Sequence, residues 1–393
     1  MERRCGLKKP LLMIPGPTEA SKRVLKVLSH PIVPHYGEDW KPIYDETISL
    51  LKKLFKTSGH MFIIPGAGSL AVEISAINTM DEGMKIAIPS NGYFGERLQK
   101  IFSAHGEVLN INFEWGEEID LDKVEEKIAQ DHKVKALAAV HCETSTGMIN
   151  PIEKLGRIAA KYNLIYIVDA ISSIGGMEFK MDEWNVDITF VGPQKCLGAI
   201  AGITPVAVSE KFWKYLDNRV KPVPSWYLNL KTWRDYVKKS PWHPYPSTLS
   251  SPLIIALREA LLEIFEEGLE KRFERHVKAA KAMRTGLKEL GFKVIAKDEN
   301  ASSTVTAALT PENVKPATLI SKVLKNHNIL ISSGLGKLRE KAIRVGHMAN
   351  TATLEHVLKT INAIGEEITK LGLKTDVSRA LKKVEEAYEE CGK

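Results

Sequence analysis

A single lysine, Lys195, interrupts an otherwise apolar stretch and is the first residue to suggest chemistry. Residues 188–209, ITFVGPQKCLGAIAGITPVAVS, hold no other charge, although the chain's 26% content of charged residues would place about six there. Burying an unpaired ammonium is too costly, so such a lysine is paired, deprotonated or used covalently. Desolvation lowers a lysine pKa, as a nucleophile that forms a Schiff base requires. The alternative interpretation is a surface lysine on the turn between two strands.

Asp169 repeats this pattern. It is the only charged residue in residues 163–177, NLIYIVDAISSIGGM, and it stands at the carboxyl end of a predicted strand. Ligands of open α/β sheets bind at that edge. An aspartate that caps a following helix is the alternative. Two lone charges, each on an apolar segment at the end of a strand, favour a shared site over an unrelated surface lysine and helix cap.

The elements that must position these residues follow from the hydrophobic pattern. Short apolar runs alternate with amphipathic stretches, which predicts a mostly parallel sheet covered on both faces. The predicted strands are 61–64, 85–88, 108–113, 134–141, 164–168 and 188–191, and the helices between them are 69–79, 96–104, 121–129 and 152–162. A long helix is predicted over 253–290, followed by strands at 292–295, 304–309 and 329–332 and then by helices.

The chain of 393 residues is long enough for two domains that share a large core. We predict an N-terminal arm over residues 1–20, a large domain over 21–270 and a small domain over 271–393. The net charge of +7 is spread among 48 acidic residues without a long basic run, so no nucleic-acid partner is expected. No apolar run reaches 18 residues and the basic start lacks a signal-peptide core, which indicates a cytoplasmic protein without a membrane partner.

Four cysteines occur without paired spacing, which indicates reduced thiols rather than a disulfide framework. They are Cys5, Cys142, Cys196 and Cys391. We expect no metal site.

The runs IVDAISSIGG and VGPQKCLGAIAG resemble the class V, fold-type I aminotransferases, and most closely the alanine–glyoxylate/serine–pyruvate aminotransferases. The resemblance extends from about Pro15 to Thr353, with several motifs in the same order. It implies an α/β fold, with a large domain built on a mostly parallel sheet of the seven-stranded type and a smaller α+β C-terminal domain. It also implies pyridoxal 5′-phosphate (PLP) as the cofactor.

The resemblance also gives roles to the two lone charges and their neighbours. Lys195 matches the lysine that holds PLP as a Schiff base and moves the proton at the substrate Cα. Asp169 matches the carboxylate that pairs with the pyridine nitrogen, so that the ring can act as an electron sink. Thr144, in HCETSTG, matches the residue that binds the phenolic oxygen of the ring. Ile171 and Phe94 match the residues on the two ring faces, and many relatives have Trp or Tyr in place of Phe94.

The phosphate site of the resembled family falls on PGAGSLAVE, which follows a predicted strand and opens a helix. Amides at a helix N-terminus bind anions. Gly68 and Ser69 match phosphate-binding residues, and Gln194 is a further donor. Ala67 stands where relatives often have serine, which removes one hydroxyl contact.

Three further residues match family positions outside these segments. Tyr245 and Thr248, in HPYPSTLSS, match residues that reach the phosphate of the neighbouring subunit, so the resemblance implies a homodimer with shared active sites. Arg344, in KAIRVGHM, matches the arginine that clamps the substrate carboxylate, a task that suits a bidentate guanidinium.

Several other functions remain open at this point. Gly66, Gly68 and Ala71 also fit a dinucleotide fingerprint. The fingerprint requires an acidic residue about 20 positions further on, whereas Asp81 and Glu82 lie only about half as far from Ala71. A PLP lyase such as a cysteine desulfurase would stack a histidine where Phe94 stands, and Cys142 and Cys196 fit better as small packed residues. A non-enzymatic relative would be expected to lose Lys195 or Asp169.

The predicted reaction is transamination from serine or alanine to glyoxylate or pyruvate. Pyridoxamine–pyruvate and 2-aminoethylphosphonate transaminases share these motifs and are the alternatives. The sequence alone does not decide between donors or acceptors.

Overall fold

The computed structural model describes residues 9–390 of the chain, so Cys5 and Cys391 lie outside the described residues. Its centre is a seven-stranded sheet whose middle strands are apolar and buried along nearly their whole length, as strands covered on both faces must be. In spatial order the strands are β2 (His60–Pro65), β10 (Ile203–Val208), β9 (Ile188–Phe190), β8 (Ile165–Asp169), β5 (Val134–Val140), β3 (Lys85–Ser90) and β4 (Glu107–Asn112).

The strand directions confirm the predicted α/β class. All neighbouring pairs from β9 to β4 are parallel, whereas β10 runs antiparallel to both β9 and β2. The six predicted strands are all present, each within two residues of its expected ends. β10 was not predicted as a strand of this sheet.

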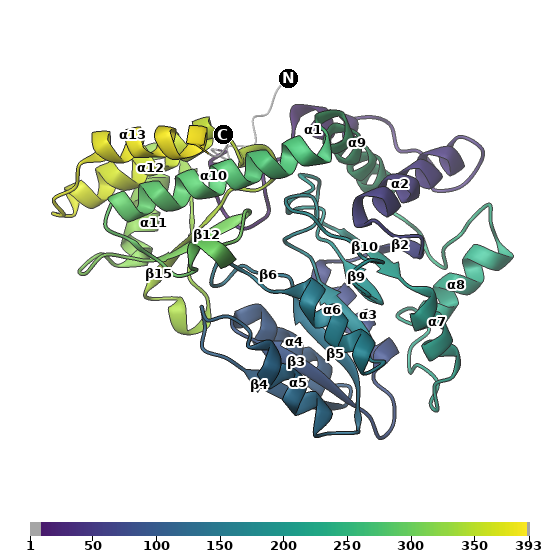
Figure 1. The fold of residues 1–393 in the computed structure, drawn as a ribbon. Coiled ribbons are helices and arrows are strands. Elements are labelled where there is room, and N and C mark those ends of the chain that lie inside the picture. The colour runs from purple at the N-terminus through teal and green to yellow at the C-terminus, as the bar shows by residue number, and fades with distance from the viewer. Residues whose placement is uncertain (1–8, 391–393) are drawn as a thin grey trace.

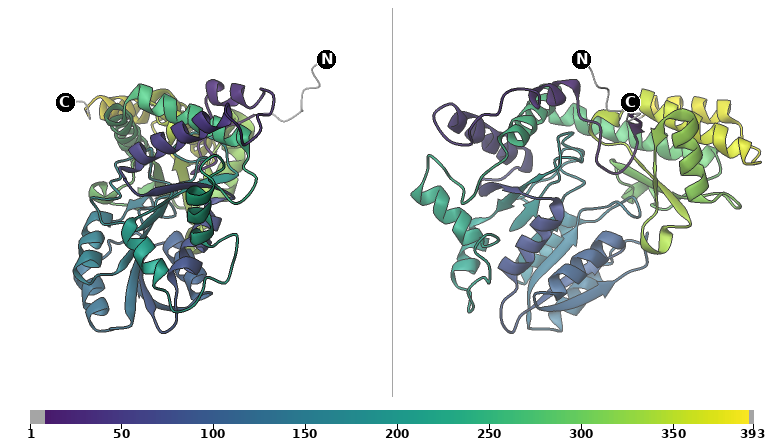
Figure 2. Two further views of the ribbon diagram at one scale, coloured as in Figure 1. Left: turned by 90° about the vertical axis from the view of Figure 1, so that its right-hand side faces the viewer. Right: turned by 180° about the vertical axis from the view of Figure 1, so that it is seen from behind.

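Helices cover both sides of this sheet (Figures 1 and 2). α3 and α4 pack together on one side, and α5 and α6 lie next to each other on the other. The helices of this part of the chain are α1 (Lys22–Val27), α2 (Trp40–Phe55), α3 (Gly68–Thr79), α4 (Tyr93–Ser103), α5 (Leu121–Ala129), α6 (Ile152–Lys161), α7 (Glu210–Asp217), α8 (Leu230–Lys239) and α9 (Ser251–Glu267).

The helix predicted over 253–290 is two helices, because the chain turns at Gly268, whose φ of +85° is a conformation that glycine adopts without strain. α9 ends there and α10 (Leu269–Glu289) runs along the top of Figure 1 towards the C-terminal part. That part contains β11 (Lys293–Val294), β12 (Val305–Leu309), α11 (Pro316–His327), β13 (Ile329–Leu330), β14 (Ser332–Ser333), β15 (Ala342–Gly346), α12 (Leu354–Lys370) and α13 (Val377–Glu390).

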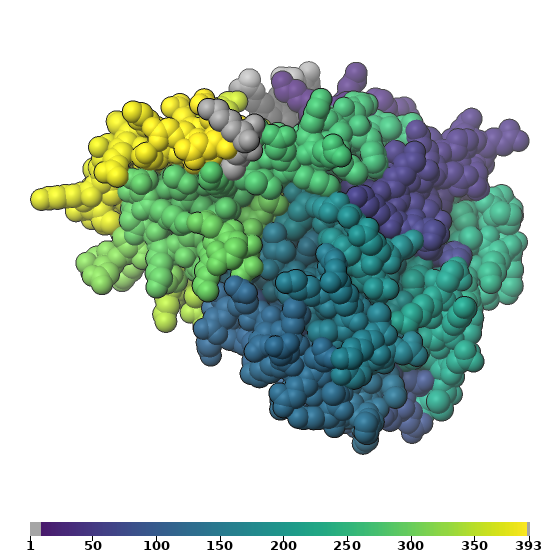
Figure 3. Space-filling model, in the orientation of Figure 1, coloured from purple at the N-terminus to yellow at the C-terminus, as the bar shows by residue number. Residues whose placement is uncertain are grey.

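A second, antiparallel sheet, in the order β11-β12-β15-β14, has its own buried core. At the surface, the C-terminal part, coloured green to yellow, lies beside the blue and teal part that contains the first sheet (Figure 3). The N-terminal strand β1 (Leu11–Leu12) pairs with β13, and Met13 belongs to this second core. The division of the chain near residue 270 stays a prediction. None of the helices within residues 9–390 has the length and hydropathy needed to cross a bilayer.

Candidate active site

A pocket of about 180 Å³ opens at the carboxyl ends of the parallel strands, where the sequence places its lone charges. Asp169 is the last residue of β8, and Lys195 follows β9 by five residues. Most of the predicted site residues line this pocket together. They are Ala67, Gly68, Ser69, Phe94, Thr144, Asp169, Ile171, Gln194 and Lys195, and they are joined by Arg97, Val140, Cys142 and Ser172.

The amine of Lys195 is partly buried in this pocket. Withdrawal from water lowers its pKa to about 8, and the positive charges of Arg344 and Arg97 act in the same direction. The anionic side chain of Asp169 opposes the shift. The amine donates a hydrogen bond to the carbonyl oxygen of Pro15. The amine therefore loses its proton closer to neutral pH than an ordinary lysine does, which suits a nucleophile or a proton acceptor.

Asp169 presents a carboxylate oxygen to the pocket. Its Oδ1 accepts a hydrogen bond from the Ile171 amide at 3.0 Å, while its Oδ2 lies 3.8 Å from the Arg97 Nη2, too far for a hydrogen bond. Burial raises the pKa of Asp169, and Arg97, the Ile171 amide and Lys195 oppose that shift. An additional proton-bearing group at Oδ2 would therefore stabilise the carboxylate.

Arg97 is a site residue that the sequence reasoning missed. It lies three residues after Phe94 on α4, so both side chains project from the same face of the helix. Its guanidinium stacks on the Phe94 ring, 4.6 Å from the ring centre, and faces Asp169. Its place in NGYFGER, at helical spacing from a predicted ring-stacking residue, is the signal that could have identified it.

The start of α4 is fixed by Glu143, a second residue that was not predicted. Its Oε2 accepts hydrogen bonds from the Phe94 and Gly95 amides, both at 3.0 Å. Gly92, the residue directly before α4, has no side chain that could cap the helix, so the buried Glu143 carboxylate caps it from another segment. Glu143 thereby holds Phe94 at the pocket wall.

The segment predicted to bind phosphate follows β2 and opens α3. α3 begins at Gly68, directly after the extended residue Ala67, so its first amides are not used within the helix. Gly68 packs closely on Ile171, since a Cβ there would lie 2.5 Å from the Ile171 Cδ1. Ser69 is exposed and lines the same pocket as Gln194. The segment can hold an anion next to Lys195.

Arg344 lies behind the pocket wall rather than among the residues that line it. It is buried on β15, where its Nε donates to the Ser333 carbonyl at 2.9 Å and its Nη1 lies 3.5 Å from the Thr144 carbonyl. Burial lowers the pKa of Arg344 to about 10, and the negative charge of Glu143 opposes that shift. Thr144 lines the pocket, so a single residue separates the Arg344 guanidinium from the pocket.

Tyr245 and Thr248 are not brought to the pocket of their own chain. Tyr245 is buried, and its hydroxyl accepts from the Trp40 indole at 2.7 Å and donates to the His35 carbonyl. Thr248 is exposed. A role for this pair in a neighbouring subunit's site stays a prediction.

The thiols near the site are poor nucleophiles. Burial raises the pKa of Cys142 to about 11 and that of Cys196 to about 12. Cys196 donates to the Ser172 carbonyl at 3.3 Å, and Cys142 lies 3.2 Å from the Ser302 hydroxyl. Both are packed as small buried side chains, whereas a reactive cysteine is at least partly exposed.

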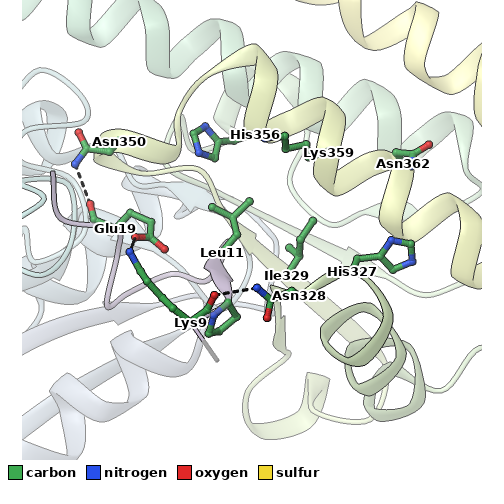
Figure 4. A pocket seen from close by; sticks show the side chains of 11 residues that line it. Lys9, Leu11, Glu19, His327, Asn328, Ile329, Asn350, His356, Lys359 and Asn362 are labelled. Atoms are coloured by element: carbon green, nitrogen blue, oxygen red, sulfur yellow. Dashed lines mark hydrogen bonds and ion pairs between the residues drawn. The ribbon is translucent and has the colours of Figure 1, made fainter. Parts of the chain in front are cut away.

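A larger hollow of about 700 Å³ lies between the N-terminal segment and α12 (Figure 4). Its polar side chains bind groups of the protein itself: Lys9 pairs with Glu19 at 2.7 Å, and the Asn350 and Asn328 amides donate to the carbonyls of Glu19 and Lys9. Figure 4 shows these contacts along one wall of the hollow. We assign it no chemistry.

Comparisons with known proteins agree with this geometry. The family model of the class V aminotransferases matches residues 21–359. An uncharacterized aminotransferase of Methanocaldococcus jannaschii is 36% identical over 371 residues, which cover 94% of this chain and 95% of that protein. An alanine–glyoxylate aminotransferase of Drosophila melanogaster is 31% identical over 389 residues, which cover 95% and 98%. The crystal structure of the ureidoglycine–glyoxylate aminotransferase of Bacillus subtilis, 30% identical, matches with a TM-score of 0.93 over 98% of this chain and 100% of that one.

Proposed function

The chain belongs to the class V aminotransferases, which are PLP-dependent enzymes, and on that premise we propose that it transfers an amino group from serine or alanine to glyoxylate or pyruvate. The observation that carries the proposal is the convergence of Lys195, Asp169 and the start of α3 on one pocket with Arg344 behind its wall. The relatives named for alanine–glyoxylate and ureidoglycine–glyoxylate transamination support small substrates.

The residues present in the pocket fit PLP. Lys195 would hold it covalently through its amine, Asp169 would pair with the ring nitrogen through Oδ2, and the α3 amides would bind the phosphate. The remaining contacts would come from the other lining residues: Gln194 and Ser69 at the phosphate, Phe94 and Ile171 on the ring faces, and Thr144 at the phenolic oxygen. When bound, PLP supplies an electron sink for the bond that breaks at the substrate Cα.

The chain's own residues then account for the remaining steps. Arg344 binds the substrate carboxylate and thereby orients the Cα–H bond. Lys195, with its pKa lowered to about 8, accepts the proton from Cα and can return it, because a pKa close to the working pH suits proton transfer in both directions. Phe94 and Ile171 exclude water from the two sides of the reaction centre.

The preference for a small neutral side chain follows from the charges around the pocket. A distal carboxylate in this site would need its own cation. Lys337 pairs with Glu114 at 3.2 Å, and Arg339 is exposed, and neither lines the pocket. Arg97 does line it, and its guanidinium is directed to Asp169.

Replacing Arg344 with alanine should lower kcat/KM for alanine by roughly a hundredfold, the loss of about 3 kcal/mol that a charge-assisted contact provides. Steady-state kinetics with serine, alanine, aspartate, glutamate and 2-aminoethylphosphonate measure this and rank the donors. Arg339→Ala removes the same charge from an exposed position and should change nothing. A preference for aspartate or glutamate would assign Arg97 to a distal carboxylate. Unchanged kcat/KM for alanine in Arg344→Ala would remove the proposed clamp.

We also propose that the active unit is a homodimer. Tyr36 and Trp242 are large aromatic residues with exposed fractions of 56% and 67%. The Tyr36 ring contacts His35, and the Trp242 ring contacts His243. The His243 ring also contacts the rings of His35 and Tyr245, so all five rings form one cluster. An exposed aromatic surface of this kind is typical of a protein interface, and Thr248 lies three residues further along the chain.

Mixing inactive Lys195→Ala subunits with Thr248→Asp subunits should restore activity. In the mixed dimer one site receives Lys195 from one chain and Thr248 from the other, so that site is intact. Subunit exchange followed by an activity assay measures the recovery, with each variant mixed with itself as the control. Full activity in a monomer, shown by light scattering at the assay concentration, would contradict the dimer.

A further inference from the structure

The N-terminal segment over residues 13–18 contacts Lys195 beside the active-site pocket, and the proposed mechanism gives it no role. At its start it is attached to the second sheet: the Met13 amide donates to the Leu330 carbonyl at 2.9 Å, and the Gly346 amide donates to the Met13 carbonyl at 3.0 Å. Gly346 ends the strand that carries Arg344. A Cβ on Gly346 would lie 2.7 Å from the Pro15 nitrogen, so the two backbones are in close contact.

At its other end the segment is bound to the main chain of Lys195. The hydroxyl of the buried residue Thr18 donates to the Lys195 carbonyl at 2.9 Å, and the Thr18 amide donates to the Gln194 carbonyl at 2.9 Å. These two hydrogen bonds join residues that are more than 170 positions apart in the chain. They hold the peptide from which the lysine side chain projects.

Between these two ends the segment contacts the lysine side chain itself. The Lys195 amine donates to the Pro15 carbonyl. Gly16 has a φ of +90°, a conformation that favours glycine, and a Cβ on it would lie 2.6 Å from the Lys195 Nζ and displace the tip of the lysine. The segment therefore contacts both the root and the tip of the same side chain.

We propose that residues 15–18 position Lys195: the Thr18 hydroxyl fixes its main chain, and the Pro15 carbonyl receives its amine whenever the lysine is not covalently bound. The proposal rests on the proposed function in taking Lys195 as the residue that binds PLP. Holding the amine at one place keeps it near the pocket and removes the search for a reactive orientation. Pro15, Gly16 and Thr18 are then positioning residues.

The test is the rate at which the apoenzyme binds PLP covalently, followed by the absorbance of the lysine-bound cofactor after mixing with PLP alone. Thr18→Val keeps the shape of the side chain and removes the hydroxyl. It should slow covalent capture about fivefold, as the loss of one ordinary hydrogen bond predicts. It should leave the amount of PLP bound at saturation unchanged.

Two variants make the comparison specific. Thr18→Ser retains the hydroxyl and should restore capture to near the wild-type rate. Thr360→Val removes an equally buried hydroxyl that donates to the His356 carbonyl at 2.7 Å on α12, and its capture rate should equal that of wild type. If Thr18→Val does not fold, Thr18→Ala removes the same hydroxyl with less bulk and should show the same slowing.

Capture by Thr18→Val at the wild-type rate would overturn the proposal, and so would equal slowing in Thr18→Val and Thr18→Ser, since that pattern indicates packing rather than hydrogen bonding. The assay contains no amino acid, so an error in the proposed substrates does not affect it. Capture of PLP by Lys195→Ala with the same absorbance change would instead contradict the proposed function.

Discussion

Purified Lys195→Ala protein is expected to lack the visible absorbance of lysine-bound PLP and to have no measurable transaminase activity. Lys195 is the one amine that lines the pocket among residues 9–390, and its lowered pKa of about 8 gives it both nucleophilic and proton-accepting character. Removing it eliminates the covalent attachment and the proton transfer at the substrate Cα together. Absorbance spectra of the purified protein and single-turnover assays with alanine measure the two losses.

Lys337→Ala is the control for this substitution. Lys337 is exposed, pairs with Glu114 and does not line the pocket. Its loss should leave the spectrum and the turnover unchanged. An unaltered spectrum with retained transamination in Lys195→Ala would show that another amine holds the cofactor.

Asp169→Asn should keep the fold and reduce transamination by two to three orders of magnitude, equivalent to about 3–4 kcal/mol of transition-state stabilisation. An amide in place of the carboxylate removes the negative charge that favours a protonated ring nitrogen, so bound PLP becomes a weaker electron sink. The same substitution should weaken PLP binding. Circular dichroism, PLP titration and kcat with alanine separate the effects on folding, binding and chemistry.

Asp187, the residue directly before β9, offers a matched control at the same sheet. It is buried, accepts from the Tyr166 amide at 2.9 Å and pairs with Lys211 at 3.2 Å, away from the pocket. Asp187→Asn should lower the thermal stability while the activity per folded molecule is retained. If Asp169→Asn behaved in the same way, Asp169 would be a structural residue.

Much of the sheet was predictable because its strands are short apolar runs separated by amphipathic helices. β10 was missed because it belongs to the same apolar stretch as Lys195, in which no further charge marks where one element ends and the next begins. Periodicity alone does not show that such a run turns back and pairs antiparallel. The break at Gly268 was missed because an isolated glycine is tolerated within a helical pattern and does not by itself mark the end of a helix.

The candidate site was predictable where a residue is unusual in its own segment. Lys195 and Asp169 are the only charges in their stretches, and the structure places both on one pocket. Arg97 is one of several charged residues on an amphipathic helix, and its relation to Asp169 depends on contacts between different strands and helices. The contact between Thr18 and Lys195 likewise joins segments whose local sequence gives no sign of it.

Reduction of the PLP-loaded enzyme with borohydride, followed by proteolysis and mass spectrometry, tests the central claim most directly. Reduction makes the attachment between the cofactor and its lysine permanent, so the labelled residue can be read from the peptide. The structure predicts a single labelled peptide with the modification on Lys195. A label on any other lysine, or no label on a protein that transaminates, would contradict the account.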